Sequence, residues 1–119
     1  MATLTTQEIS ESGKVLTMTA AAETGDKYLN EGNQIIVVKN TGESMTITVT
    51  AQVTALDYAP WGKSTKSNAT LVVASNKEGF IGPFPPAAYN DADGYVQITY
   101  SAIDGVTVAV ARLKSTGTL

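Results

Sequence analysis

The side-chain types that most often carry out catalysis are scarce in this chain of 119 residues. It contains no histidine and no cysteine, so acid–base or nucleophilic chemistry would depend on its eleven carboxylates. Nearly all of these lie in or beside turns, as Glu31, Glu43 and Asp104 do next to glycines. Carboxylates in turns usually accept hydrogen bonds from backbone N–H groups and stay solvated. We therefore favour turn formation over a glycosidase-like carboxylate pair, and the sequence predicts a protein that is not an enzyme.

The stretch Asn90-Asp91-Ala92-Asp93-Gly94 comes closest to a metal-binding motif. An EF-hand loop places its glycine after a third oxygen ligand and a glutamate further along, whereas here glycine follows the second aspartate and Tyr100 takes the later position. Zinc and iron sites draw mainly on histidine and cysteine. No helix is expected after Gly79 and Gly82, so they do not indicate a phosphate-binding loop. The sequence favours a hairpin turn over a calcium site and predicts no metal and no cofactor.

Eight aromatic side chains could form a stacking platform for sugars or single-stranded nucleic acid. They are Tyr28, Tyr58, Trp61, Phe80, Phe84, Tyr89, Tyr95 and Tyr100. Most occupy strand positions or lie beside prolines, where packing is the ordinary explanation. Trp61 is the exception because it stands between Pro60 and Gly62, and a large aromatic side chain on a loop is a common interface anchor.

Length and composition predict one folded domain that binds neither nucleic acid nor membranes. The hydrophobic fraction of 43% and the charged fraction of 16% are typical of a globular chain. The net charge is −3 and Arg112 is the only arginine, so no basic face is available for phosphates. Neither a polybasic run nor a basic amphipathic helix for anionic lipid is visible. Because the first residues lack the pattern of a signal peptide, we expect synthesis in the cytoplasm, with export only as part of a larger particle.

Hydrophobic residues alternate with polar ones along most of the chain, which indicates strands with one buried face. Residues 44–53 show this best, because apolar side chains alternate there with Thr46, Thr48 and Thr50. The predicted strands lie at 15–21, 34–39, 44–53, 70–74, 78–84, 96–100 and 106–111. Short strands without helices predict an all-β fold, which we expect to be a jelly-roll-like β-sandwich of seven to eight antiparallel strands with an extended N-terminal arm.

Asparagine, aspartate, glycine and proline punctuate these strands at short intervals, as tight turns require. The predicted structural turn residues are Gly25, Asp26, Asn30, Gly32, Gly82, Pro83, Asn90, Asp93 and Gly94. Two stretches look less regular. Residues 1–13 are polar and predict an arm that precedes a single domain at 14–119, and residues 56–68 predict a long loop.

Three parts of the sequence together resemble a known family. They are Gly25-Asp26-Lys27-Tyr28-Leu29-Asn30-Glu31-Gly32 with Ile36-Val37-Val38-Lys39-Asn40-Thr41-Gly42, then Ile81-Gly82-Pro83-Phe84-Pro85-Pro86 with Tyr89-Asn90, Asp93-Gly94 and residues 96–101, and finally residues 105–113. Their order and spacing resemble the capsid decoration, or cement, proteins of tailed bacteriophages. The resemblance extends from about residue 13 to residue 113 and does not include residues 56–68.

The resemblance implies a β-sandwich or jelly-roll protein, often a homotrimer, without catalytic activity. It would sit on the outer surface of the virion capsid and stabilise contacts between subunits of the major capsid protein. Such a protein bridges several subunits, so modest individual contacts gain from multivalency. The residues expected at the capsid or subunit interface are Thr3, Leu4, Thr5, Ile9, Tyr58, Trp61, Phe84, Pro85 and Tyr89.

Three other functions stay open on the sequence alone. A carbohydrate- or receptor-binding module on the virion surface would place exposed Trp61 or Tyr58 beside acidic residues in one concave site. Another structural head or tail component fits the composition equally well. An enzyme is the least favoured alternative, because the residue types that it would need are missing. The fold alone does not decide among these functions.

Overall fold

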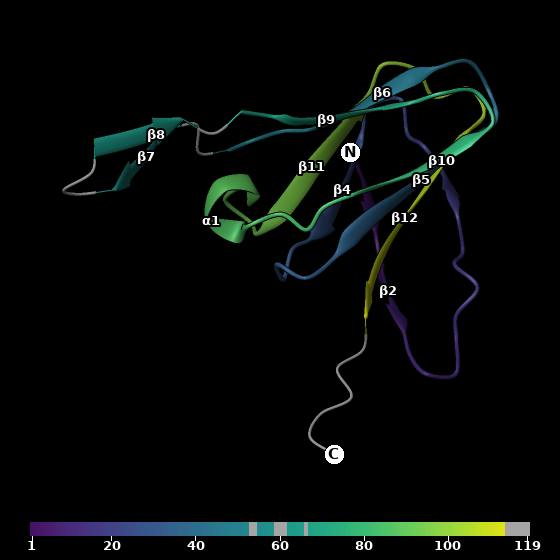
Figure 1. The fold of residues 1–119 in the computed structure, drawn as a ribbon, viewed down its shortest axis with the longest axis horizontal. Helices are drawn as coiled ribbons and strands as arrows, with labels where there is room; N and C mark the ends of the chain where they lie inside the picture. The colour runs from purple at the N-terminus through teal and green to yellow at the C-terminus, as the bar shows by residue number, and fades with distance from the viewer. Residues whose placement is uncertain (53–54, 59–61, 66, 114–119) are drawn as a thin grey trace.

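The computed structural model describes residues 1–52, 55–58, 62–65 and 67–113, which form two mixed sheets of five strands that enclose a common core (Figure 1). Sheet A has the order β1 (Ala2–Leu4), β4 (Asp26–Leu29), β11 (Tyr95–Tyr100), β6 (Met45–Val49) and β9 (Ala69–Val73). Sheet B has the order β10 (Lys77–Ile81), β5 (Ile35–Asn40), β12 (Val106–Leu113) and β2 (Thr6–Ile9), and β3 (Thr19–Ala20) also pairs with β12. We call these two sheets the two-sheet body.

The period-two pattern of the sequence is confirmed in the strands of sheet A. In β6, Met45, Ile47 and Val49 are buried, whereas Thr46 and Thr48 are half-buried on the other face. The apolar side chains of β6 meet those of β5, β11 and β12 in one core. Alternate side chains of a strand point to opposite faces, so one face of each sheet closes the core and the other is left outside.

The central strands of sheet B are apolar on both faces. Val38 and Val108 point into the core, while their neighbours Val37 and Ala109 are also buried although they lie on the outer face. Leu16 and Met18, from the segment before β3, are half-buried and share a pocket with Val37. The continuously apolar sequence of β5 therefore reflects a strand that is covered on both sides, as predicted for a central strand.

The extended arm predicted at residues 1–13 is not confirmed, because most of this segment forms strands. β1 pairs in parallel with β4 in sheet A, and β2 pairs in parallel with β12 in sheet B. The chain passes from one sheet to the other at Thr5, and Leu4 is only 7% exposed. The prediction of seven to eight antiparallel strands is wrong for the same reason, since the described residues form twelve strands and two of the pairings are parallel.

The long loop predicted at residues 56–68 is also wrong. β7 (Ala55–Tyr58) and β8 (Gly62–Thr65) pair as an antiparallel hairpin that forms a small sheet of its own. A single helical turn, α1 (Pro86–Tyr89), precedes β11, and Pro86 suits the first helical position because its missing N–H has no acceptor there. No helix in the described part of the chain is long and apolar enough to cross a membrane.

Candidate interaction surfaces

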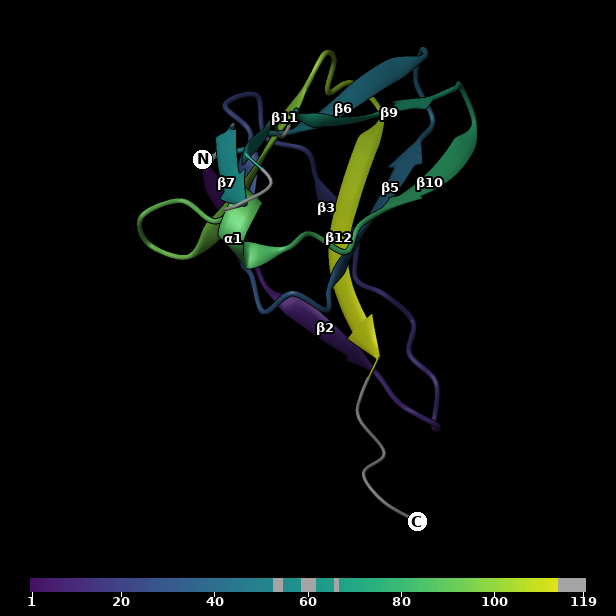
Figure 2. The same ribbon diagram turned by 60° about the vertical axis from the view of Figure 1, so that its left-hand side comes forward.

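The β7–β8 hairpin is the most prominent feature outside the two-sheet body (Figures 1 and 2). β6 leads into β7 and β8 leads into β9, so the four strands form one long ribbon with a break where it leaves the body. At the break, the Ala51 N–H donates to Asn68 Oδ1 at 2.9 Å. The hairpin therefore leaves the body from a closed base.

Helix α1 braces this base from the side. The Gln52 N–H donates to the Ala88 carbonyl at 2.9 Å, and the Tyr89 hydroxyl donates to the Ser67 carbonyl at 3.2 Å. Tyr89 also packs edge-to-face against Phe84, with ring centroids 4.9 Å apart. Each side of the ribbon is thus tied at the base of the hairpin to α1, which follows the proline-rich corner.

The residues predicted for an interface are spread over several places. Thr3 is exposed within β1 and Thr5 directly after it, Ile9 is half-buried on sheet B, and Pro85 is exposed before α1. An interface role for Leu4, Phe84 and Tyr89 is not supported, because these side chains are buried in the core. Tyr58 ends β7, but its side chain and the whole of Trp61 lie outside the described residues.

Asn30 joins several of the predicted turn residues into one network. Its Oδ1 accepts the Gly32 N–H at 2.9 Å, while its Nδ2 donates to the Phe84 carbonyl at 3.0 Å and to Asn90 Oδ1 at 2.7 Å. Asn40 repeats the first contact, since its Oδ1 accepts the N–H of Gly42 at 2.9 Å. These buried amides connect turns that are far apart in the sequence.

Asp26 was predicted in a turn, but it is the first residue of β4 and is fully buried. Its Oδ2 accepts hydrogen bonds from the Tyr100 hydroxyl at 2.7 Å and from the Ala22 N–H at 3.2 Å. Burial, and then the contact with Asp26, raises the pKa of Tyr100 above its usual range. A carboxylate held in this way supports the strand pairing and is not exposed to a ligand.

Asp91 organises the turn that contains Asp93 and Gly94. Its Oδ1 accepts the N–H groups of Asp93 at 2.9 Å and Tyr95 at 3.0 Å, and its Oδ2 accepts a hydrogen bond from Gln97 at 3.0 Å. The turn that the sequence favoured at this position is therefore confirmed, but it joins α1 to β11 and is not the turn of a β-hairpin. Among the residues that the structure describes, no cluster of histidine, cysteine and carboxylate side chains has the geometry to hold a metal ion.

We expect Asp91 to make the stability of the protein depend on pH in acidic solution. The hydrogen bond from Gln97, and then that from the Tyr95 N–H, lowers the pKa of Asp91 below its usual value of 3.8. A carboxylate with a lowered pKa in the folded state stabilises the fold above its unfolded pKa, and this contribution disappears as the pH falls through the folded pKa. Between pH 5 and pH 2, roughly the range in which carboxylates titrate, Asp91→Asn should therefore lose less stability than the wild type in urea unfolding. If the free energy of unfolding falls equally with pH in the two proteins, Asp91 does not cause this pH dependence.

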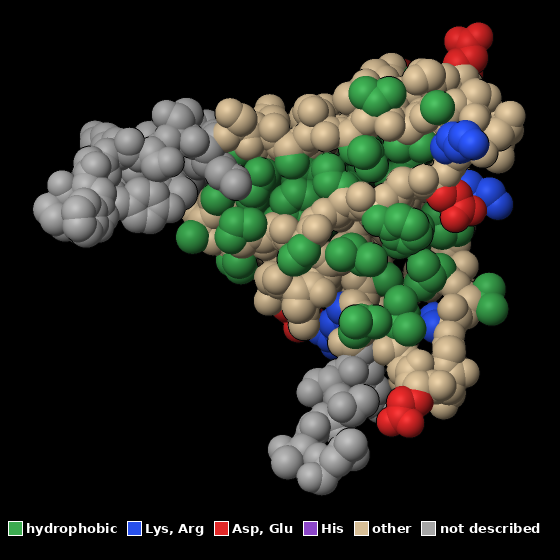
Figure 3. Space-filling model, in the orientation of Figure 1, with side chains coloured by type: hydrophobic (Ala, Val, Ile, Leu, Met, Phe, Trp, Pro, Cys, Tyr) green, Lys and Arg blue, Asp and Glu red, His purple; other side chains and the backbone are tan. Residues whose placement is uncertain are grey.

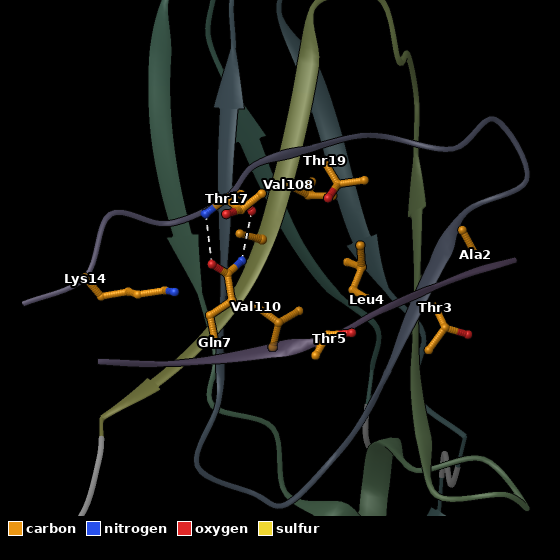
Figure 4. A pocket seen from close by; sticks show the side chains of 11 residues that line it. Ala2, Thr3, Leu4, Thr5, Gln7, Lys14, Thr17, Thr19, Val108 and Val110 are labelled. Carbon is orange, nitrogen blue, oxygen red and sulfur yellow. Dashed lines mark hydrogen bonds between the residues drawn. The ribbon is translucent and has the colours of Figure 1, made fainter. Parts of the chain in front are cut away.

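A pocket of about 370 Å³ lies where β1 passes into β2 (Figure 4). Gln7 closes one side, since its amide donates to the Thr17 carbonyl at 2.8 Å and accepts the Thr17 N–H at 2.8 Å. Thr3, Thr5 and Lys14 also line the pocket. This arrangement attaches the segment before β3 to β2 and contains no carboxylate that could act as an acid or base.

The outer face of sheet A is lined with threonine. The strand registers place Thr70 beside Thr48 and Thr48 beside Thr99, so three hydroxyl-bearing side chains form a row across β9, β6 and β11. Lys27 lies on the same face, with its ammonium 4.8 Å from the centre of the Tyr95 ring. This row of hydroxyl groups is polar and uncharged.

The outer face of sheet B is apolar in two places. Figure 3 looks at the molecule from a side on which strands of both sheets are visible, and hydrophobic side chains gather over the middle of this side. One hollow of about 380 Å³ is lined by Ile9, Asn33, Ile35, Ala111, Arg112 and Leu113. Arg112 forms ion pairs at its rim with Glu31 at 2.6 Å and with Glu8 at 2.9 Å, and these contacts raise the pKa of Arg112. The second apolar place surrounds Phe80, whose side chain is 63% exposed.

The sequence alone did not indicate which apolar side chains are exposed on the outer faces of the two sheets. Phe80 and Val72 belong to strands that were predicted, but the face on which each side chain lies depends on strand pairing that the sequence pattern does not specify. The one available signal was the uninterrupted apolar run of β5, which indicates that the outer face of sheet B is also apolar.

Comparison with known proteins gives no relative for this chain. No family model matches it, and neither the curated proteins nor the solved structures contain a significant match.

Proposed function

We propose that this protein is a capsid decoration protein of a tailed bacteriophage, which binds the outer surface of the head and stabilises contacts between major capsid protein subunits. The order and spacing of the motifs from Gly25 to Leu113 support this proposal. The observation that carries it in the structure is the β7–β8 hairpin, which stands outside the two-sheet body on a braced base.

The hairpin is too small to be stable by itself. A two-stranded sheet is marginal in water unless further strands or a packed surface support it. β7 and β8 pair only with each other in the described part of the chain. A partner surface that covers the hairpin would supply the missing support, and a shell made of many capsid subunits offers such a surface next to every bound copy.

We also propose that the two-sheet body is a jelly-roll-like β-sandwich. The chain crosses repeatedly between the two sheets: β4, β6, β9 and β11 belong to sheet A, whereas β5, β10 and β12 belong to sheet B. Frequent crossing between facing sheets is typical of Greek-key and jelly-roll sandwiches. A rigid body of this kind can present loops and a hairpin to several neighbours at once.

Co-sedimentation with undecorated capsids tests the function directly. A variant in which a short glycine–serine linker replaces residues 53–66 should keep the two-sheet body, because the Ala51–Asn68 hydrogen bond still closes the ribbon. We expect its occupancy on capsids to fall at least about tenfold, since multivalent binding is lost when one contact is removed. The circular dichroism spectrum should change only by the loss of the hairpin.

A matched control is Thr99→Lys, which adds a charge to the outer face of sheet A and leaves the hairpin intact. If wild-type protein fails to bind undecorated capsids at all, the proposed function is wrong. In that case, specific binding of the wild-type protein to glycans on an array would favour the carbohydrate-binding alternative. This binding should be lost in the variant without the hairpin.

A further inference from the structure

We propose that β9 pairs with β9 of a second copy of this chain, so that the A sheets of two copies form one continuous sheet across a two-fold axis. β9 is the last strand of sheet A, and its one partner among the described strands is β6. The backbone groups on its other side are therefore open to a further strand. This proposal does not depend on the capsid function.

The four sheet edges differ in how they are protected from such pairing. Native proteins usually block an exposed edge with charged residues, proline, a bulge or a very short strand. β1 has only three residues, β2 carries Glu8 in its ion pair with Arg112, and β10 carries Lys77 and Glu78. Residues 67–76, which include all of β9, hold neither a charged residue nor a proline.

β9 is also well suited to extend a sheet. Its sequence is Ala69-Thr70-Leu71-Val72-Val73, and β-branched residues of this kind favour strands. Val72 is 66% exposed on the outer face, so this strand presents a large apolar side chain to water. An open edge with these properties is expected to be covered in the functional protein.

A second copy of β9 fits this edge because the strand is self-complementary. Antiparallel pairing centred on Leu71 places Thr70 opposite Val72 of the other copy, and both residues lie on the outer face of sheet A. Ala69 then lies opposite Val73 of the other copy, and both residues face the core. In the joined sheet, outer-face residues of one copy therefore lie beside outer-face residues of the other, and core-facing residues lie beside core-facing residues. A shift of register by one residue would place the core-facing side of one copy on the outer face of the other. No charges meet across the axis.

The absence of cysteine from the chain allows this register to be tested with engineered disulfides. In the double variant Thr70→Cys and Val72→Cys, the thiol at position 70 of one copy lies opposite the thiol at position 72 of the other copy. We expect mild oxidation to give a covalent dimer. The single variants should not cross-link, because each thiol would lie diagonally across from its equivalent, about 7–8 Å away between α-carbons. If the double variant cross-links no better than the single variants, the proposed pairing is wrong.

The mass of the wild-type protein in solution provides an independent test. Light scattering should give the mass of a dimer, and Val72→Lys should raise the dissociation constant at least about tenfold because it introduces charge at the edge. Thr99→Lys is the matched control, since it adds the same charge to the same face on the central strand β11. A monomer at every concentration would overturn the proposal. So would the homotrimer that the resemblance implies, because a two-fold axis cannot relate three copies.

Discussion

Gly25→Ala is expected to destabilise the protein by about 3–5 kcal/mol, a loss that falls in the severe range for a single substitution. Gly25 has a φ of +94°, a conformation that favours glycine. A methyl group at this position would also lie 2.5 Å from the Ile98 carbonyl oxygen. That oxygen belongs to the backbone of β11 and cannot move without disturbing its pairing with β4.

Gly94→Ala separates the two causes of this loss. Gly94 has almost the same backbone conformation, with a φ of +88°, but the nearest atom to an added methyl group is Leu29 Cδ1 at 3.6 Å. Only the backbone strain applies there, so we expect a loss of about 1–2 kcal/mol. Urea unfolding of both variants gives the comparison. Equal losses would show that the contact with Ile98 does not restrict residue 25.

The second large effect concerns the N-terminal strands. Deleting residues 1–9 removes an edge strand from each sheet and takes Leu4 out of the core. Loss of one buried leucine side chain alone destabilises a protein by about 2–5 kcal/mol. With the strand pairing lost as well, the total should exceed about 5 kcal/mol, which is comparable to the whole stability of many domains. We therefore expect the truncated protein to be unfolded or only partly folded by circular dichroism.

Two substitutions within β1 serve as controls for the deletion. Leu4→Ala should destabilise by about 2–4 kcal/mol because the side chain is buried, whereas Thr3→Ala should stay within about 0.5 kcal/mol because its side chain is exposed. A truncated protein that keeps its structure and loses only capsid binding would restore the arm interpretation that the sequence favoured.

Local patterns predicted the strands whose alternation is strong. The strand predicted at 44–53 is shorter in the structure, as β6 (Met45–Val49), and the one predicted at 106–111 is β12 (Val106–Leu113). Both were predictable because apolar and polar residues alternate along β6 and because valine recurs at every second position in the first half of β12. The turn at Asp91 was recognised because aspartate and glycine side by side favour a tight turn. In each case the information lies within a few neighbouring residues.

Features that depend on distant partners were not predictable in this way. β1 and β2 contain only two large apolar residues, Leu4 and Ile9, and become strands because β4 and β12 offer free edges. The same applies to Asp26, whose neighbours resemble a turn although Tyr100 holds it inside the body. Likewise, the exposed edge at β9 cannot be recognised until the strand order is known.

The pairing of β2 with β12 also affects the order in which the protein can fold. Arg112 and Glu8, which form an ion pair across these strands, are 104 residues apart in the sequence. During synthesis Glu8 leaves the ribosome long before Arg112 has been made. Sheet B therefore closes only when the last strand has been made, and contacts of such long range slow folding. β2 lacks its β12 partner during that interval, and stable pairing in sheet B should appear only after β12 has left the ribosome.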